Sequence, residues 1–373
     1  MTPSGEVARS ARQITMKIHK ATKKYEAWLG EHTPLLKADI ELKHQRMTED
    51  LFAFLRATFY RWMQLWRDEC PEEARAPKVL AVGDLHVENF GTWRDIEGRL
   101  IWGINDLDEA YRLPYTIDLV RLATSAHLAI AAAHLKVELE EACKVILEGY
   151  AKGMEEGGRP FVLAEEHSWL RDLALGELRD PVGFWQKMDS LATLRTPIPA
   201  SAREALEHLL PERGLKYRVA HRIAGLGSLG RERYVALADW RGGQVAREAK
   251  ALVPSACFWA AGEEGPKEIL YQSALSCAVR CGDPFVQLRG HWIVRRLAPD
   301  CSRIELASLP KEREETKLLD AMGRETANLH LGSREIVAEV RRDLRKRPTG
   351  WLHAAARRMV KATTGDWQEW KQA

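Results

Sequence analysis

The sequence predicts an α+β fold in which a larger helix-rich lobe accompanies a smaller antiparallel sheet. Before residue 215 and after residue 311, long stretches have apolar residues three and four positions apart, which is typical of amphipathic helices. Between them the pattern changes to period-two alternation with glycine-rich turns. We therefore expect a helix-rich lobe over residues 1–215, a sheet lobe over residues 216–310, and a helical return to the first lobe over residues 311–373.

Composition excludes several classes of protein. The 373 residues are 45% hydrophobic, enough for a substantial core, and the 56 basic and 53 acidic side chains nearly balance, which argues against a dedicated nucleic-acid binder. The most apolar segment, residues 119–135, is interrupted by Arg121 and His127, so no membrane span is expected. The six cysteines form no CxxC pair. We expect a cytoplasmic protein with neither a nucleic-acid nor a membrane partner.

The elements follow in order along the chain. Residues 35–67 have helical periodicity, with Thr48 and Asp50 as a plausible helix start. Residues 78–109 form a hairpin-like pair of strands, and residues 116–154 one or two central helices. The later segments are expected to be a helical and loop-rich stretch (155–215), three antiparallel strands (217–255), a short helix (268–279), a strand pair (284–298), a helix (314–333) and a helical C-terminus.

Polar side chains gather where the two predicted strands of residues 78–109 end. Asp84 and Asn89 lie in the loop after the first strand, and Asp106 and Asp108 follow the second. Carboxylates brought together raise one another's pKa unless a hard cation neutralises them, and Mg²⁺ is the default candidate. An acid, an asparagine five residues later and a strand-end aspartate also follow the order of a kinase's base and two metal ligands. We therefore predict that Asn89 and Asp106 bind magnesium, and that Asp108 is either a further magnesium ligand or a neighbour that supports the ligands.

The sheet lobe contains a glycine-rich segment between its first two predicted strands. Gly225, Gly227, Ser228 and Gly230 could bring backbone N–H groups close to phosphate, although a plain hairpin turn explains the glycines equally well. On the third strand Arg247 and Lys250 are both candidates for the cation that neutralises the phosphates, and they point to opposite faces. Glu268, at the start of the next helix, is the candidate partner of that cation.

The motif "GDLHVENF" at residues 83–90 resembles the catalytic loop of small-molecule kinases such as the aminoglycoside and choline phosphotransferases. "INDLD" and "IDLVRLA", which contains Asp118, match the segments that follow it in those enzymes. The resemblance implies a protein kinase-like two-lobe fold in which His86 braces the loop and Asp118 supports it. Because the nucleotide lobe follows the catalytic loop here, it also implies a circular permutation.

The longer run of motifs resembles the bacterial family known as domain of unknown function 2252 across nearly the whole chain. These motifs include "FAFLRATFYRW", "RIAGLGSLGRERYVAL" and "REAKALVPSA". That family is grouped with kinase-like phosphotransferases and has no assigned activity. Where the family typically has a lysine before Glu-Ala, this chain has Arg247.

These observations predict an ATP- and Mg²⁺-dependent phosphotransferase that acts on a small-molecule hydroxyl or amine. Asp84 would orient or deprotonate the acceptor, and residues 155–215 with the terminal helices would line the acceptor pocket. Two alternatives use the same residues. One is a pseudokinase or sensor that binds nucleotide without catalysis, and the other is a metal-dependent phosphohydrolase.

Overall fold

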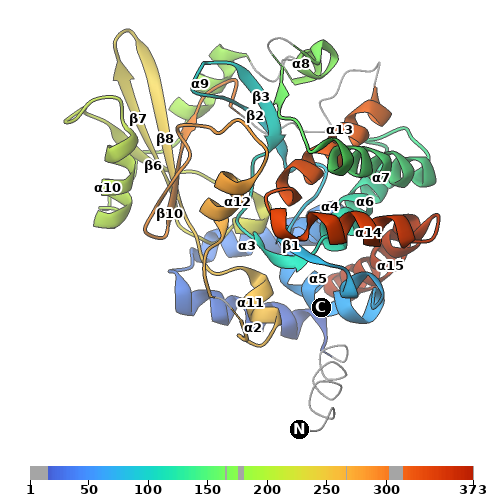
Figure 1. Ribbon diagram of the computed structural model, residues 1–373. Coiled ribbons are helices and arrows are strands. Elements are labelled where there is room, and N and C mark those ends of the chain that lie inside the picture. The colour runs from blue at the N-terminus through green and yellow to red at the C-terminus, as the bar shows by residue number, and fades with distance from the viewer. Residues whose placement is uncertain (1–15, 164–165, 175–179, 266, 302–313, 373) are drawn as a thin grey trace.

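The protein has an antiparallel sheet on one side and a larger body of helices on the other (Figure 1). The computed structural model describes residues 16–163, 166–174, 180–265, 267–301 and 314–372. The expected mixture of helices with small antiparallel sheets is confirmed. Within these ranges no helix combines the length and the apolar character needed to cross a bilayer.

The first part of the chain is helical. Its four helices are α2 (Ile18–His32), α3 (Lys37–Glu49), α4 (Leu51–Ala57) and α5 (Phe59–Glu69). Asp50 begins α4, because its carboxylate accepts a hydrogen bond of 2.6 Å from the backbone N–H of Ala53. The single long helix pattern of residues 35–67 is therefore three consecutive helices, and the predicted start at Asp50 is confirmed.

The strands that follow pair differently from the prediction. β1 (Lys78–Ala81) pairs with β4 (Tyr111–Pro114), whereas β3 (Leu100–Ile104) pairs with β2 (Phe90–Arg94) and with β5 (Phe161–Val162). The predicted pairing of β1 with β3 is wrong. Residues 90–94, which lie between the two predicted strands, form the strand next to β3 instead. The Asp84–Asn89 loop therefore joins two separate small sheets.

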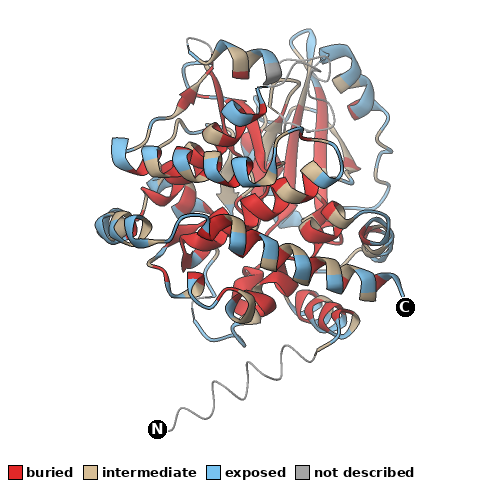
Figure 2. Ribbon diagram, turned by 90° about the vertical axis from the view of Figure 1, so that its right-hand side faces the viewer, coloured by how far each residue is buried: buried red, intermediate tan, exposed pale blue. Residues whose placement is uncertain are grey.

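In the middle of the helical body, glycines allow two helices to pack closely against each other. α7 (Leu139–Glu156) and α13 (Glu315–His330) pack so closely that a Cβ on Gly149 would lie 2.2 Å from the Asp320 carbonyl oxygen, and a Cβ on Gly323 would lie 2.2 Å from that of Ile146. The almost entirely buried α6 (Thr116–Ala131) packs against α7 and α15 (Trp351–Lys371), and α14 (Val337–Lys346) packs against α7. Figure 2 shows the buried residues in the interior and the exposed residues on the outer helix faces.

The largest described sheet has five strands, all antiparallel, in the order β6-β7-β8-β10-β9. Their bounds are β6 (Arg218–His221), β7 (Arg233–Trp240), β8 (Gly243–Ala251), β9 (Gln287–Arg289) and β10 (Trp292–Leu297). The three strands expected over residues 217–255 and the later strand pair are confirmed.

Helices cover the sheet on both sides. α10 (Ala200–Leu209) packs its apolar residues against Ala249 and Trp292 on one face. α9 (Pro181–Asp189) places Met188 against Val235 on the other. Both helices precede residue 216, where the sheet lobe was expected to begin. The remaining helices are α8 (Ser168–Ala174), α11 (Ala256–Ala260) and α12 (Tyr271–Cys277).

Candidate functional site

The loop after β1 is held by a buried carboxylate on α6. Asp118 accepts hydrogen bonds from the backbone N–H groups of Val82 (2.7 Å) and Gly83 (2.9 Å), which is the kind of contact expected of it. His330 lies 2.9 Å from the same carboxylate, and neither side chain is exposed. Gly83 has φ +82°, and a Cβ there would lie 2.5 Å from the Glu109 carbonyl oxygen. These contacts give Asp84, the next residue, a fixed position.

Asp84 is paired with Arg121, a residue that sequence reasoning did not select. Arg121 on α6 donates from Nε to Asp84 Oδ1 over 2.7 Å, and its Nη2 contacts the same oxygen. The guanidinium is fully buried between the rings of Phe59 and Trp62. Burial nevertheless raises the pKa of Asp84 to about 7, although the Arg121 charge opposes it. A carboxylate with that pKa is suited to proton transfer near neutral pH.

The rest of the loop is braced from within. Asn89 donates from Nδ2 to the Asp84 carbonyl oxygen over 2.6 Å. The main chain of Asp84 therefore orients the Asn89 side-chain amide. The backbone N–H of Glu88 donates to His86 Nδ1 over 3.2 Å. His86 therefore contacts the backbone of the loop to which it belongs.

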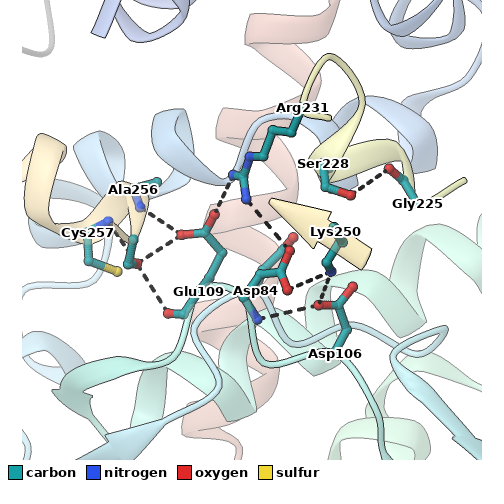
Figure 3. A network of polar contacts seen from close by, with 12 residues as sticks. Asp84, Asp106, Glu109, Gly225, Ser228, Arg231, Lys250, Ala256 and Cys257 are labelled. Atoms are coloured by element: carbon teal, nitrogen blue, oxygen red, sulfur yellow. Dashed lines mark hydrogen bonds and ion pairs between the residues drawn. The ribbon is translucent and has the colours of Figure 1, made fainter. Parts of the chain in front are cut away.

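Lys250 lies between the two strand-end aspartates. Its Nζ is 2.6 Å from Asp108 Oδ1 and 3.6 Å from Asp106 Oδ1 (Figure 3). Burial favours a higher pKa for Asp106, but Lys250 and then Arg295 outweigh it and hold that pKa well below its usual range. Burial and the neighbouring Asp106 charge raise the pKa of Asp108. One of the two carboxylates is thus strongly anionic and the other is easily neutralised.

Arg247, the other candidate cation, is on the opposite face of β8. Its Nε donates to the Leu209 carbonyl oxygen over 2.8 Å, and its guanidinium stacks on Phe285. Glu268 is exposed and precedes α12 by three residues. The structure therefore places Lys250, but neither Arg247 nor Glu268, beside the aspartates.

The glycine segment covers Asp84. A Cβ on Gly227 would lie 3.0 Å from the Arg56 carbonyl oxygen and 3.5 Å from Asp84 Oδ2, so only glycine permits this approach without displacement. Ser228 accepts a hydrogen bond of 2.7 Å from Arg233 and donates one of 3.2 Å to the Gly225 carbonyl oxygen. Lys43 of α3 donates to the Gly227 carbonyl oxygen over 3.3 Å. The glycine segment is thus tied to the first lobe as well as to its own sheet.

Arg231 and Glu109 form a second buried pair that was not predicted. Arg231 Nη2 lies 3.4 Å from Glu109, and its Nη1 lies 3.6 Å from Asp108 (Figure 3). Glu109 also accepts hydrogen bonds from Ser255 Oγ and from the backbone N–H of Ala256. Their sequence positions offered a signal, since Glu109 directly follows Asp108 and Arg231 directly follows Gly230.

Many of these groups line one pocket, of about 600 Å³ with the open solvent at its mouth, whereas Lys250 and Arg121 lie behind its lining. It is lined by predicted residues from three segments: Asp84, His86, Asn89, Asp106, Asp108, Gly225, Gly227 and Ser228. Gly230 packs on Ile40 instead. The expectation that residues 155–215 line this pocket is not met by the described part of that stretch. The N-terminal helices supply its other wall, with Tyr25, Arg56, Phe59 and Tyr60.

The oxygen donors of the site can be compared with what a magnesium ion requires. No group of three or more His, Cys, Asp or Glu side chains is arranged for a metal ion in the described ranges. Magnesium needs fewer protein ligands, because one or two carboxylates commonly hold it together with phosphate oxygens and water. Asp106, Asp108 and the Asn89 amide fit that smaller requirement. The Lys250 ammonium occupies the position between the carboxylates, where it lowers their mutual repulsion.

Comparison with known proteins gives one similarity. The model of a family described as an uncharacterized protein conserved in bacteria (DUF2252) matches residues 35–173, less than half of the chain. The matched stretch contains Asp84, Asn89, Asp106, Asp108 and Asp118, whereas the glycine segment and Lys250 lie beyond it. No curated protein and no solved structure matches the chain.

Proposed function

We propose that the protein is an ATP- and Mg²⁺-dependent phosphotransferase acting on a small-molecule hydroxyl or amine. The observation that carries this proposal is the convergence of Asp84, the Asp106–Asp108 pair and the glycine segment on one pocket, although about 120 residues separate the last two in sequence. Phosphoryl transfer needs these parts: a base or orienting carboxylate, oxygen ligands for a cation, and a glycine-rich cover for the phosphates.

The arrangement of the small lobe supports a kinase-like fold with a circular permutation. A glycine segment joins the first two strands of the sheet, and Lys250 lies on the third. This is the relationship that a kinase uses to place its phosphate-covering loop and its lysine. Here both follow the Asp84 loop in the chain. After β10, α13 returns to the loop and contacts it through His330 and Asp118.

Each residue has a definite task in the proposed reaction. Asp84 accepts a proton from the acceptor hydroxyl or amine, and its pKa of about 7 makes it competent to do so near neutral pH. Arg121 holds one carboxylate oxygen, so the other is turned toward Gly227 and the pocket. Asp106, Asp108 and Asn89 would hold Mg²⁺, which neutralises phosphate charge when it is bound. Lys250 and the backbone of the glycine segment hold the phosphates.

The helical wall of the pocket favours a small acceptor over a folded protein substrate. The N-terminal helices place Tyr25, Arg56 and Tyr60 in the pocket wall, close to Asp84.

A second candidate is a nucleotide-binding protein without transferase activity. The specific observation in its favour is the contact of the glycine segment with Asp84, because a phosphate can enter between them only if the segment moves. The two candidates differ in product formation and share nucleotide binding.

The test is thermal unfolding with and without Mg²⁺-ATP, followed by an acceptor screen for ADP release. Ligand that binds only the native state raises the unfolding midpoint. We expect a magnesium-dependent rise that Asp106→Ala reduces and that Asp84→Asn retains, with ADP release lost in Asp84→Asn. Asp239→Ala, an exposed aspartate of β7, is the matched control. A midpoint that saturating Mg²⁺-ATP leaves unchanged would refute both candidates, and binding without any ADP release would favour the second.

A further inference from the structure

A second pocket borders the candidate site on the far side of Asp106. Its wall includes Asn105 and Leu107, which flank Asp106 in the chain, together with residues of β2, α12 and β10. The basic residues in this wall are Arg280, Arg295 and Arg296, and Asp283 is the carboxylate among its described lining residues. The pocket encloses about 510 Å³, including its mouth. This wall is therefore richer in positive charge than that of the first pocket.

Arg280 has guanidinium N–H groups that form no hydrogen bond with the described residues. Its Nη2 donates to the Ile104 carbonyl oxygen over 3.1 Å, whereas Nε and Nη1 are buried without a hydrogen-bond partner among the described residues. The guanidinium carbon lies 4.5 Å from the centre of the Trp93 ring. Stacking satisfies the face of a guanidinium, but its N–H groups point outward in the plane. Two donor groups of Arg280, one on each side of Nη2, therefore lack an acceptor among the described residues.

Arg296, on β10, repeats this arrangement. Its guanidinium carbon lies 4.2 Å from the centre of the Phe285 ring, and its Nε is buried without a partner in the described part of the chain. Its Nη2 reaches only the Cys301 sulfur, a weak acceptor, over 3.5 Å. Arg295, in contrast, donates from Nε to Glu248 over 2.9 Å. The spare donors thus belong to Arg280 and Arg296.

The nearby carboxylates have hydrogen-bond partners other than the free arginine donors. Asp283 accepts a hydrogen bond from the backbone N–H of Phe285, and burial raises its pKa. Glu325, which acts electrostatically on Arg280, is engaged by the backbone N–H of Ile104 and by Asn328, and burial raises its pKa as well. Neither acid hydrogen-bonds to the free donors of Arg280 or Arg296 in the described part of the chain.

We propose that this second pocket is an anion-binding site in which Arg280 and Arg296 donate to a phosphate group. Guanidinium N–H groups donate charge-assisted hydrogen bonds to phosphate oxygens, and desolvated surroundings strengthen such bonds. The phosphate has two possible sources: free inorganic phosphate, or the phosphate chain of a nucleotide that also reaches the candidate site beside Asp106. This inference goes beyond the proposed function, because the pocket can bind phosphate whether or not transfer takes place.

The experiment titrates the full chain with inorganic phosphate at constant ionic strength and follows the unfolding midpoint. The variants are Arg280→Met and Arg296→Met, which keep an unbranched apolar side chain against Trp93 or Phe285. Arg203→Met, on the exposed side of α10, is the matched control. We expect the apparent affinity for phosphate to fall roughly tenfold or more in each pocket variant and to stay unchanged in the control.

A structural role for Arg280 makes a different prediction. If stacking on Trp93 is its purpose, Arg280→Met lowers the midpoint in phosphate-free buffer. If anion binding is its purpose, that midpoint stays equal or rises, because two unpaired buried donors are removed. Arg296→Met supplies the same comparison where Arg280→Met does not fold. A phosphate response that is absent from the unsubstituted protein, or that both variants retain in full, overturns the proposal.

A second arm identifies the source of the phosphate. If the group belongs to a nucleotide, inorganic phosphate competes with Mg²⁺-ATP, and Arg280→Met weakens both ligands. If the ion is free, phosphate and Mg²⁺-ATP raise the midpoint independently, and Arg280→Met affects phosphate alone. A response to phosphate without any response to Mg²⁺-ATP refutes the proposed function and supports the anion site, whereas the reverse result does the opposite.

Discussion

Arg121, a fully buried residue of α6, forms an ion pair with Asp84 in which its Nε lies 2.7 Å from one carboxylate oxygen. The pair places a permanent positive charge against the residue with the chemistry of a general base. It lowers the pKa of Asp84, yet burial still raises that pKa to about 7. The balance between the two effects sets the pH at which Asp84 becomes a base.

The first prediction concerns the pH dependence of turnover. Asp84 loses its proton as the pH rises through its pKa, so ADP release is expected to increase with pH and to level off above about pH 8. Arg121→Met removes the charge that lowers the pKa, which moves this rise to higher pH. The measurement is kcat/KM for ATP turnover against pH in both proteins. A rise that stays at the same pH in Arg121→Met would contradict the role of Arg121.

The stability of Arg121→Met needs a separate check, because the substitution breaks a buried pair. Removing one partner of such a pair costs up to about 3–5 kcal/mol when the other charge stays buried. We expect a smaller loss, since Asp84 can take up a proton near neutral pH. Urea unfolding of Arg121→Met and Asp84→Asn gives the free energies of unfolding that decide this point.

The second prediction separates the two cations of β8. Lys250→Met leaves Asp106 and Asp108 without the ammonium between them, so Mg²⁺-ATP affinity should fall at least about tenfold if Lys250 contacts phosphate. Arg247→Met should change that affinity by less than about twofold, because Arg247 lies on the other face of the strand. Isothermal titration with Mg²⁺-ATP measures both. Equal losses in the two variants would show that the strand acts through stability alone.

Much of this site could be predicted because its parts are local in sequence. Asp84 and Asn89 share one loop, Asp106 follows a buried strand, and Gly227 lies in a segment whose glycines stand between two alternating stretches. Period-two alternation also located β7 and β8. Such features are visible in the sequence because the residues that define them lie only a few positions apart.

The parts that could not be predicted depend on distant segments. Arg121 is a single charge in an apolar helix, and Lys43 looks like a solvated helix residue, yet both reach the site through tertiary contacts. The pairing of β1 with β4 was missed for the same reason, since periodicity identifies strands and says nothing of their partners. The sequence also did not decide which of the expected segments line the pocket: the N-terminal helices do, whereas the described part of residues 155–215 does not.

The third prediction tests the close approach of the glycine segment. A Cβ on Gly227 would press on the Arg56 carbonyl oxygen at 3.0 Å, so Gly227→Ala should shift the segment away from Asp84 and change the affinity for Mg²⁺-ATP. Gly243→Ala is the control, because a Cβ there meets nothing within 4 Å and its φ is not in the left-handed region. Each titration is paired with a thermal unfolding curve. The same affinity in both variants would argue against a nucleotide beneath this segment.

The fourth prediction concerns the carboxylate that holds the Asp84 loop. Asp118→Ala leaves the backbone N–H groups of Val82 and Gly83 buried without an acceptor, and each such loss costs about 1–3 kcal/mol. Asp118→Asn keeps an acceptor oxygen, so its free energy of unfolding should fall less. Glu140→Ala, an exposed acid in the first turn of α7, should stay within about 0.5 kcal/mol of the unsubstituted protein. Urea unfolding measures all three, and equal losses in Asp118→Ala and Glu140→Ala would exclude a supporting role for Asp118.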